Sequence, residues 1–452
     1  MRIIVNGCGK IGTTIIANLV SEGHDVTVID TNPSVIERLT NIYDVIGVCG
    51  NGADSNLLQE ADVASHDLLI STADSDEINM LACFFAKKLG VKNTVARIRN
   101  PEYNANSLNF IRNTLDISLS INPEAMVAQE IFNLLRLPSV AKVENFSAKN
   151  MEMIEFKIKE DSPLIGMKIC EARNKFKSKF LICAVQRGDD VFIPGGNFTL
   201  LEGDKIGITA SMVEIIHLFK ELGIKKTSAK KVMILGGSKS AVFLAEKLCE
   251  TGHTVTIIEK NRERCEELLE DLPKALIICG DVSSQELLME EGLTTADAVV
   301  ALTGLDELNV LIASFCSSKK VPKVIAKISR PELMPLTEHW GLETVVSSRK
   351  SVANTVVRYA RALDNSQGSN VETLYKLMDD KVEALEFIAK PDLAILDTEF
   401  KDLKLKENIL IAGIIRNRRI ITPTGSDKIL AGDKVIVFST GHKINDLSDI
   451  AR

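Results

Sequence analysis

The chain has 452 residues, enough for about two to four domains, and its 45% apolar and 25% charged residues are typical of a globular protein. Its formal net charge of -7 argues against nucleic acid as the main partner, because phosphate backbones attract basic surfaces. No apolar run approaches the ~18 residues of a membrane span, and because a strand begins at once we expect no signal peptide.

The first residues form a strand–turn–helix pattern that predicts a dinucleotide-binding site. The apolar run Ile3–Val5 is a short buried strand, and an apolar segment at helical spacing follows the turn. In such a turn the first glycine allows the tight bend, the second lets backbone N–H groups approach a pyrophosphate, and the third lets the helix pack closely. The helix N-terminus adds partial positive charge. The turn residues predicted to bind are Gly7, Cys8, Gly9, Lys10, Ile11 and Gly12.

An acidic residue completes this pattern. The second strand, Val26–Ile29, ends at Asp30, which lies 18 positions after Gly12. A carboxylate there accepts hydrogen bonds from a ribose 2′-hydroxyl and repels a 2′-phosphate, so NAD is favoured over NADP. A glycine-rich turn without a ligand is the weaker interpretation, because strand, helix and acid all stand in the required order.

The first half continues as a doubly wound domain, and a strand-rich pattern of elements then follows it. Four further strands are predicted, at Val45–Cys49, Leu68–Thr72, Thr94–Ile98 and Ile117–Ile121, which gives a six-stranded parallel sheet over residues 1–122. A helix at Pro123–Leu135, a strand-rich block over about 141–210 and a helix over 213–222 predict a small α+β domain within 123–224. We interpret residues 225–230 as an exposed linker.

The chain then repeats itself at an offset of 229 or 230 residues. Gly7 corresponds to Gly236 and Asp30 to Glu259, while Asp-Glu-x-Asn occurs at both 76–79 and 306–309, and Gly-Asp-Lys at both 203–205 and 432–434. The second half therefore predicts another doubly wound domain over 231–350 and another small domain over 351–452. Its helix is expected near 351–363 and its strands near 382–438. The fold class is α/β, with two tandem repeats.

Several motifs together resemble one family. They are the opening glycine turn, the segment Asp44–Gly52, Ser-Thr-Ala-Asp-Ser-Asp-Glu-Ile-Asn at 71–79 and Ala-Arg-Ile-Arg-Asn-Pro-Glu-Tyr at 96–103, with echoes in the second half. The chain resembles, essentially end to end, the cytosolic regulatory subunits of Trk-type potassium uptake systems. These are tandem RCK (or KTN) modules, each a Rossmann domain followed by a small α+β domain.

The resemblance implies a regulatory protein with no catalytic activity of its own. It implies a peripheral protein on the inner face of the membrane, forming a homo-oligomeric ring, with a tetramer expected, beneath a membrane-embedded K⁺ translocating subunit. NAD(H), and ATP or ADP, would shift the ring between shapes. The helix at 123–135, which by itself could pack on its own sheet, would cross over to a partner subunit.

Carried over to this sequence, the family's binding residues fall after the predicted strands. Asn51 and Gly52 would lie near the adenine, Thr72 and Asp74 near the carboxyl end of the fourth strand, and Arg97 and Arg99 near phosphate oxygens. Ordinary salt bridging of the two arginines is an almost equal alternative. For Asp76, Glu77 and Asn79 the alternative to ligand binding is helix N-terminal capping and pairing with the helix dipole, which we favour for Asp76.

The second half departs from this pattern. Ser238 replaces the central glycine and Ala241 the third, and Lys327 replaces Arg97. A serine side chain stands where a pyrophosphate should approach, so binding there is an open question. The second-half residues predicted to contact a nucleotide, if one binds, are Gly236, Glu259, Asp281, Thr303 and Lys327. Arg187 and Arg416, at matching turns of the small domains, are interpreted as solvated residues.

Two alternatives remain. An NAD-dependent oxidoreductase needs a general acid or base, but the six histidines are interpreted as surface or helix-end residues, and both halves are taken up by the repeat. A scaffold that binds no nucleotide conflicts with the intact first fingerprint.

The nine cysteines lack metal-ligand spacing, so we expect no metal and interpret most, Cys49 and Cys279 included, as reduced core residues of a cytoplasmic protein. Cys8 is the exception, inside the phosphate turn.

Overall fold

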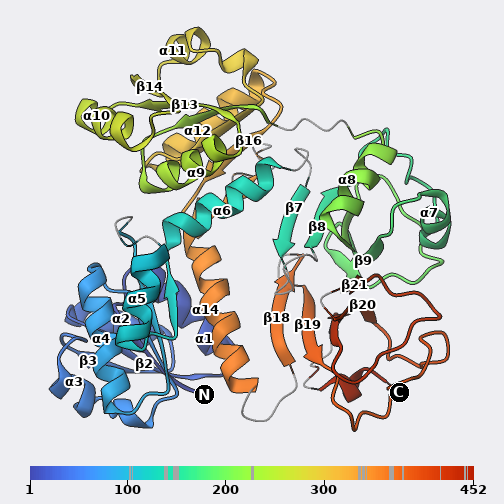
Figure 1. Cartoon of the computed structure of the whole chain (residues 1–452), viewed down its shortest axis with the longest axis horizontal. Coiled ribbons are helices and arrows are strands. Elements are labelled where there is room, and N and C mark those ends of the chain that lie inside the picture. The colour runs from blue at the N-terminus through green and yellow to red at the C-terminus, as the bar shows by residue number, and fades with distance from the viewer. Residues whose placement is uncertain are drawn as a thin grey trace. The chain divides into compact units, whose positions relative to one another are not determined.

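The chain divides into two compact units that do not coincide with the two sequence repeats. The computed structural model describes residues 1–452 apart from 101–102, 104, 137–140, 146–151, 225–228, 334–336, 338–341, 343, 366–370, 379–380, 418, 442–443, 445 and 452. One unit comprises residues 1–132, 231–320 and 324–360, and the other comprises 133–230, 321–323 and 361–452. The first unit therefore collects both doubly wound domains, and the second collects both small domains (Figure 1).

The first doubly wound domain has a parallel sheet with the strand order β3-β2-β1-β4-β5-β6, which is the Rossmann order. All six predicted strands are present, with ends shifted by one or two residues. The strands are β1 (Arg2–Asn6), β2 (Asp25–Asp30), β3 (Val45–Cys49), β4 (Leu68–Ser71), β5 (Asn93–Arg97) and β6 (Leu119–Ile121). The helices are α1 (Lys10–Ser21), α2 (Pro33–Ile42), α3 (Ser55–Glu60), α4 (Asp76–Leu89) and α5 (Ala105–Leu115).

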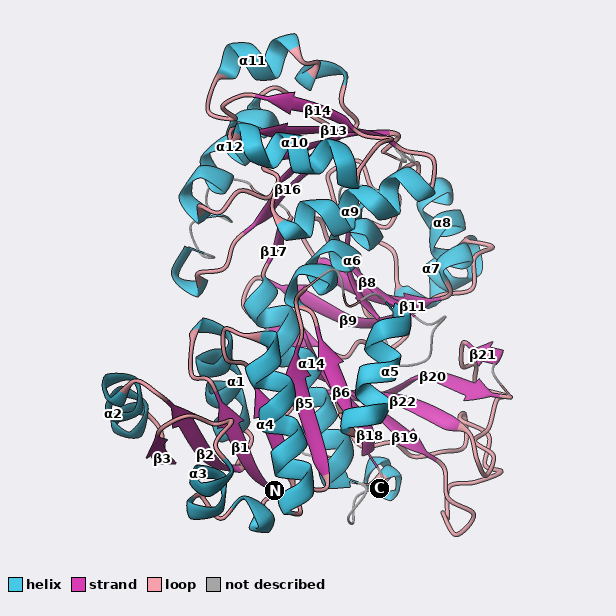
Figure 2. Ribbon diagram, turned by 60° about the vertical axis from the view of Figure 1, so that its left-hand side comes forward, coloured by secondary structure: helices cyan, strands magenta, loops and turns pink. Residues whose placement is uncertain are grey.

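Helices cover both faces of this sheet (Figure 2). Successive residues of β1 and β4 are fully buried, which is the pattern of strands enclosed on two sides. The edge strand β3 is more open, and Cys49 at its end is exposed. Cys170 and Cys279 are exposed as well, so the interpretation of Cys49 and Cys279 as core residues is wrong. An edge strand has a neighbour on one side only, and the hydrophobic pattern does not reveal which strand lies at the edge.

The second doubly wound domain repeats the plan with the order β14-β13-β12-β15-β16-β17. Its strands are β12 (Lys231–Leu235), β13 (Thr254–Glu259), β14 (Leu276–Cys279), β15 (Ala298–Ala301), β16 (Val324–Lys327) and β17 (Val345–Val346). Its helices are α9 (Lys239–Glu250), α10 (Arg262–Asp271), α11 (Gln285–Glu290) and α12 (Asp306–Ser318). The internal duplication predicted from the sequence is therefore a duplication of structure.

Two long helices follow the sheets, and each contacts the other half of the same chain. Helix α6 has the predicted bounds Pro123–Leu135, and α14 (Ser348–Asn365) begins three residues before its predicted start. On α6, Glu130 accepts a hydrogen bond of 2.6 Å from Ser351. On α14, the Tyr359 hydroxyl lies 3.5 Å from Oδ1 of Asn93. The crossing expected between subunits thus occurs within one chain, between its two halves.

The small domains are mostly antiparallel. Their sheet orders are β10-β9-β11-β8-β7 and β18-β19-β22-β20-β21. The first contains β7 (Ala141–Asn145), β8 (Glu152–Lys157), α7 (Ile169–Lys175), β9 (Leu181–Arg187), β10 (Asp190–Phe192), β11 (Lys205–Ala210) and α8 (Met212–Glu221). The second contains β18 (Val371–Leu377), β19 (Val382–Ile388), β20 (Ile409–Arg416), β21 (Arg419–Ile421) and β22 (Lys434–Ser439). Its strands begin before the predicted residue 382. Most of the predicted linker, 225–228, lies outside the described residues.

Matching ion pairs close the turns of these two domains. Arg187 donates two hydrogen bonds of 2.8 Å to Asp204, which also accepts from the backbone N–H of Leu201. Arg416 and Asp433 repeat the arrangement at 2.9 and 2.7 Å. Because both aspartates are almost completely buried, the interpretation of the arginines as merely solvated turn residues is wrong. The repeated Gly-Asp-Lys motif supplies the buried carboxylate.

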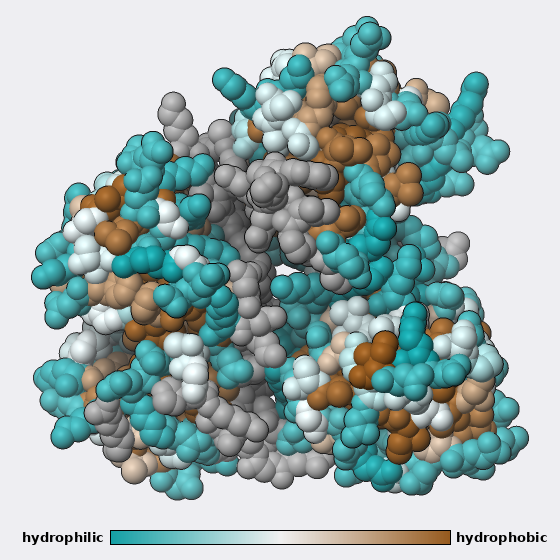
Figure 3. Space-filling view, turned by 180° about the vertical axis from the view of Figure 1, so that it is seen from behind, coloured by the Kyte–Doolittle hydropathy of each residue, from teal (hydrophilic) through white to brown (hydrophobic). Residues whose placement is uncertain are grey.

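The surface is mixed in polarity. Figure 3 shows hydrophilic residues over much of the face drawn, with hydrophobic patches between them. Among the helices that the structure describes, none combines the length and apolarity needed to cross a membrane.

We expect the Asp204→Ala substitution to lower the free energy of unfolding by about 2 kcal/mol. It removes two charge-assisted hydrogen bonds and leaves the Leu201 N–H without its acceptor, while the partly exposed Arg187 recovers hydration. Urea unfolding followed by circular dichroism measures the change. The control is Glu202→Ala, an exposed position in the same turn. Equal unfolding midpoints for the two variants would contradict a structural role for the ion pair.

Candidate functional site

A cavity of about 1090 Å³ opens at the carboxyl ends of the strands in the first Rossmann sheet. In open α/β sheets, ligands bind at this edge. The first-half residues predicted to bind line this cavity, apart from Gly12, which packs behind the turn. The second Rossmann domain lines it too, including Asp306, Glu307, Arg330 and Arg349. The cavity therefore belongs to both Rossmann domains of the first unit.

The three glycines of the turn have different surroundings. Gly7 has a φ of +84°, and a Cβ there would lie 2.4 Å from the backbone nitrogen of Ala73. A Cβ on Gly12 would lie 2.1 Å from the carbonyl oxygen of Gly7. A Cβ on Gly9 would meet no atom within 4 Å. The fold thus requires glycine at 7 and 12, whereas at position 9 the space is left open toward the cavity.

Thr72 and Asp30 tie neighbouring strand ends to this turn. The Thr72 hydroxyl donates to the Gly7 carbonyl at 2.7 Å. The Asp30 carboxylate accepts from the backbone N–H groups of Cys8 and Asn32, at 2.8 and 2.9 Å. Each carboxylate oxygen keeps a further lone pair for a ribose hydroxyl. Asp30 therefore stabilises the turn itself as well as offering acceptors to a ligand.

Beyond the third strand, the cavity has a narrow polar floor. Asn51 is exposed and accepts from the backbone N–H of Ala53. Gly52 is buried, and a Cβ there would lie 2.0 Å from Oδ1 of Asn6. The Asn6 amide in turn donates to Ser71 at 2.9 Å. Sequence reasoning missed Asn6, although a polar residue ending an apolar strand directly before the glycine turn was a usable signal.

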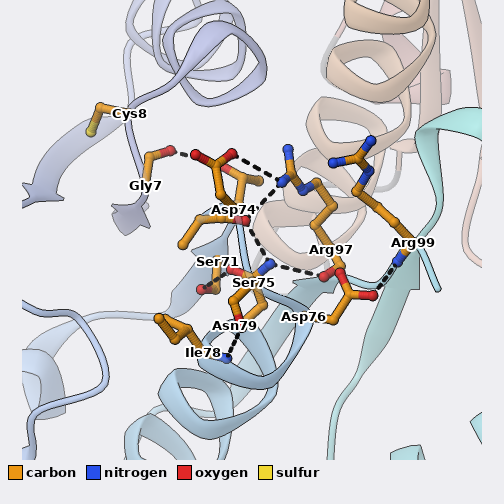
Figure 4. Close-up of polar contacts among 12 residues, drawn as sticks. Gly7, Cys8, Ser71, Asp74, Ser75, Asp76, Ile78, Asn79, Arg97 and Arg99 are labelled. Atoms are coloured by element: carbon orange, nitrogen blue, oxygen red, sulfur yellow. Dashed lines mark hydrogen bonds and ion pairs between the residues drawn. The ribbon is translucent and has the colours of Figure 1, made fainter.

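Arg97 and Arg99 lie side by side at the cavity (Figure 4). Arg97 is 6% exposed, donates to the Ala73 carbonyl at 2.8 Å and lies 3.5 Å from the exposed Asp74 carboxylate. Its Nε has no hydrogen-bond partner among the described residues. Burial and the nearby charge of Arg99 lower the pKa of Arg97. A buried guanidinium with an unused donor fits an anionic ligand.

Glu124, at the start of α6, orients Arg99. The two side chains form a hydrogen bond of 2.8 Å from Nε, and this bond raises the pKa of Arg99. Glu124 also lines the cavity, but sequence reasoning did not select it. Its only sequence signal was an acidic residue in the first turn of a helix, which capping explains equally well.

The Asp-Glu-x-Asn motif holds the arginine-bearing loop in place. Asp76 accepts 2.8 Å hydrogen bonds from the backbone N–H groups of Arg99 and Asn100. Asn79 is fully buried and donates to the carbonyls of Ala73 and Arg97. Ser75, rather than Asp76, caps α4. The capping part of the interpretation of Asp76 is therefore wrong, because its carboxylate binds the neighbouring loop, whereas its place in the first turn of α4 agrees with the expected pairing with the helix dipole. Pro101 and Glu102 lie outside the described residues.

The side chain of Cys8 faces the core, so this residue lines the cavity with its backbone. Its Sγ lies 3.5 Å from the Ile29 carbonyl, and Figure 4 shows the sulfur pointing away from Gly7 and Arg97. The residue is 1% exposed, and burial together with the Asp30 charge raises its pKa to about 12. The thiolate needed for oxidation is therefore scarce at neutral pH. Cys8 contributes its backbone N–H to the turn.

The five second-half residues that the sequence predicts to contact a nucleotide do not line this cavity. Gly236 keeps the left-handed turn, and Glu259 binds the N–H groups of Gly237 and Asn261, as Asp30 does in the first half. The other three predicted second-half residues are engaged within their own domain or largely buried. Asp281 pairs with Lys260, Thr303 hydrogen-bonds Asn309, and Lys327 is a largely buried lysine whose pKa is lowered by burial.

Two histidines lie at helix ends, as the sequence interpretation allowed, but not at the surface: His24 follows the end of α1, and His66 ends the short 3-10 helix Val63–Ser65. His24 and His66 are buried, and His66 bonds the Thr27 hydroxyl and the Asp62 carbonyl. Burial lowers the pKa of His66. His339 and His442 lie outside the described residues. Neither His24 nor His66 lines the cavity.

Comparison with known proteins gives the family. The TrkA-N domain matches residues 3–116 and 232–348, and the TrkA-C domain matches 153–223 and 384–452. The chain belongs to the TrkA family. A Trk system potassium uptake protein TrkA homolog 1 from Methanosarcina mazei is 30% identical over 97% of both chains. The Trk system potassium uptake protein TrkA of Vibrio alginolyticus is 28% identical over 98% of this chain and 96% of its own.

Solved structures support the TrkA fold. The GsuK channel bound to NAD has a TM-score of 0.63 at 17% identity, covering 97% of this chain and 77% of that one. The GsuK RCK domain has a TM-score of 0.63 at 16% identity, covering 97% and 92%. At these identities the likeness shows the fold alone. It confirms the prediction of Rossmann domains combined with small α+β domains in the RCK manner.

A comparison of Gly9→Ala with Gly12→Ala separates ligand binding from folding. Gly9→Ala places a methyl group in the open space of the cavity, so we expect nucleotide affinity to fall at least about tenfold, with less than about 1 kcal/mol lost in stability. Gly12→Ala forces a methyl group onto the Gly7 carbonyl, so stability falls by about 1–3 kcal/mol and binding falls with it. Calorimetric titration with NADH and thermal unfolding measure both. Unchanged affinity in Gly9→Ala would contradict the assignment of this cavity.

Proposed function

We propose that this chain is a cytoplasmic, nucleotide-sensing regulatory subunit of a Trk-type potassium uptake system. It binds NAD(H), and ATP or ADP, in the cavity at the ligand edge of the first Rossmann domain. We call this edge the first groove and the equivalent edge of the second Rossmann domain the second groove. The bound nucleotide controls a membrane-embedded K⁺ translocating subunit from the inner face of the membrane. The names of its full-length relatives support potassium uptake as the process. Two solved structures with the same fold are GsuK bound to NAD and GsuK bound to ADP, which supports these ligand classes.

The observation that carries this proposal is the shared lining of the cavity. Residues from both Rossmann domains surround it, with Arg97 and Arg99 on one side and Arg330 and Arg349 on the other. A nucleotide that contacts both domains has an affinity that depends on their arrangement. It therefore shifts the equilibrium between arrangements, which is what a regulator needs.

The fit of a nucleotide is supported by the residues present. Gly9 leaves room for a pyrophosphate, Arg97 keeps an unused buried donor, and Asp30 offers acceptors to a ribose while repelling a 2′-phosphate. We therefore infer NAD(H) rather than NADP(H).

An oxidoreductase is the weaker candidate. Hydride transfer generally uses a positioned acid or base, usually histidine, lysine or tyrosine, beside the nicotinamide. Among the described lining residues of the cavity, only Lys10 is of these types, and it is an exposed residue at the start of α1. The arginines that are present bind anions and keep their protons near neutral pH, so the site is suited to sensing rather than to catalysis.

We also propose a homo-oligomer, most simply a tetramer that gathers eight Rossmann domains. Repeat-equivalent leucines lie exposed on equivalent helices, Leu81 on α4 at 44% and Leu311 on α12 at 62%. Exposed aliphatic residues at matching positions of both halves favour a contact that uses both domains in the same way.

The double substitution Leu81→Glu with Leu311→Glu is expected to reduce the oligomer to smaller species, because charges are costly to bury at a contact. Size-exclusion chromatography with light scattering gives the mass. Leu269→Glu, at a 55% exposed leucine on α10, is the control and should leave the mass unchanged. An unaltered mass in the double variant would remove α4 and α12 from the interface.

Cells without this chain and without other K⁺ uptake systems are expected to take up little K⁺ at low external concentration. The wild-type chain should restore uptake, and Gly9→Asp, which places a carboxylate where phosphate would approach, should not restore it at equal protein levels. Rubidium uptake and immunoblotting measure the two quantities. Restoration by Gly9→Asp would dissociate uptake from the nucleotide site, and normal uptake without the chain would refute the proposed function.

A further inference from the structure

The two Rossmann domains share a backbone framework at their ligand edges, so side-chain differences there are informative. In both, the first glycine of the turn donates to the end of the second strand at 2.8 Å, from Gly7 to Ile29 and from Gly236 to Ile258. In both, an acid binds two backbone N–H groups around that turn. The second domain therefore retains the shape of a nucleotide site.

The floor of the second groove has become apolar. In the first groove, Asn6 and Ser71 form a buried polar pair beside Gly52, whose missing Cβ leaves space. The corresponding residues of the second groove are Leu235, Ala301 and Val282, all buried. A valine side chain now fills the position of the glycine, and no side-chain hydrogen-bonding group remains at these three positions.

An arginine lies across the second phosphate turn. Arg264 occupies the position of Val35, which lines the first cavity. Its Nε donates to the Gly237 carbonyl at 2.9 Å, and it also pairs with Glu267. Gly237 corresponds to Cys8. The turn that would receive a pyrophosphate is thus covered by a side chain of its own domain.

An ion pair joins the strand ends where adenosine lies in this fold. Lys260 and Asp281 approach to 2.8 Å, linking the residue after β13 to the loop after β14. Their counterparts, Thr31 and Asn51, both line the first cavity. The Lys260 hydrogen bond lowers the pKa of Asp281, so both partners carry their charges at neutral pH. At the turn itself, Ser238 adds a side chain where Gly9 has open space.

We propose that the second groove is closed by its own side chains, Arg264, Lys260, Asp281 and Ser238, and that each chain binds one nucleotide, in the first groove. The second Rossmann domain then acts as a wall of the first site through residues such as Arg330 and Arg349. This inference rests on the proposed nucleotide binding by the first groove. It assigns the two domains different roles despite their common fold.

Calorimetric titration of the full-length chain with NADH, and separately with ATP and ADP, measures the stoichiometry. The expected ratio is one nucleotide per chain. A ratio of two for any of these ligands would overturn the closed second groove. Absence of binding by all three would instead refute the proposed function, so the two failures are distinguishable.

Repeat-equivalent substitutions assign the site. Gly9→Asp should abolish binding, whereas Ser238→Asp should leave both affinity and stoichiometry unchanged. Position 238 is the N-cap of α9, where aspartate is among the preferred residues, although Ser238 itself makes no capping hydrogen bond. A Cβ at position 9 meets no atom within 4 Å, so both variants should fold. Thermal unfolding verifies this. Binding that survives Gly9→Asp, or that Ser238→Asp weakens more than about threefold, would place the nucleotide in the second groove and overturn the proposal.

Discussion

The geometry of the candidate site depends on two polar side chains at the start of α4. Asp76 and Asn79 take up backbone groups that the ends of β4 and β5 would otherwise leave unpaired, and the backbone they bind carries Arg97 and Arg99. Two arginines close together repel each other, so they need a rigid support. The second domain has the same device, in which Asp306 binds the N–H groups of Ser329 and Arg330, and Asn309 binds the Lys327 carbonyl. Both halves thus have the same aspartate and asparagine contacts, whereas the residues on the loop that these contacts hold differ between the halves.

Much of this arrangement could be predicted from the sequence because it follows from local rules. The glycine spacing, the acid after the second strand and the alternation of strands and helices each have a short-range cause, and they located the turn, Asp30 and all six strands. The 229-residue offset then predicted the second half from the first. The role of the repeated Asp-Glu-x-Asn motif was harder to predict. Asp76 resembles a capping residue in sequence, and only its position beside the loop after β5 shows that it binds that loop.

The remaining features are long-range and could not be predicted from pattern. Nothing in the sequence near Glu124 indicates that it pairs with Arg99, 25 positions earlier. The pairing of Arg187 with Asp204 depends on the register of β9 and β11, which sets two turns side by side. Exposure at Cys49 depends on the strand lying at the edge of its sheet. In each case, the deciding contact is made by the tertiary fold and not by neighbours in the chain.

Duplication followed by divergence gives a regulator an advantage that two identical sites would not. When one ligand contacts both domains, its binding free energy enters directly into the equilibrium between their arrangements, and a 100-fold preference for one arrangement contributes about 2.7 kcal/mol. A second ligand, bound to the second Rossmann domain, would add its own preference, which could oppose that of the first. A groove filled by Arg264 and the Lys260–Asp281 pair contributes a fixed free energy to this equilibrium, whatever the nucleotide concentration. The response of the chain then follows the occupancy of a single site, and any steepness beyond that must arise from contacts between chains.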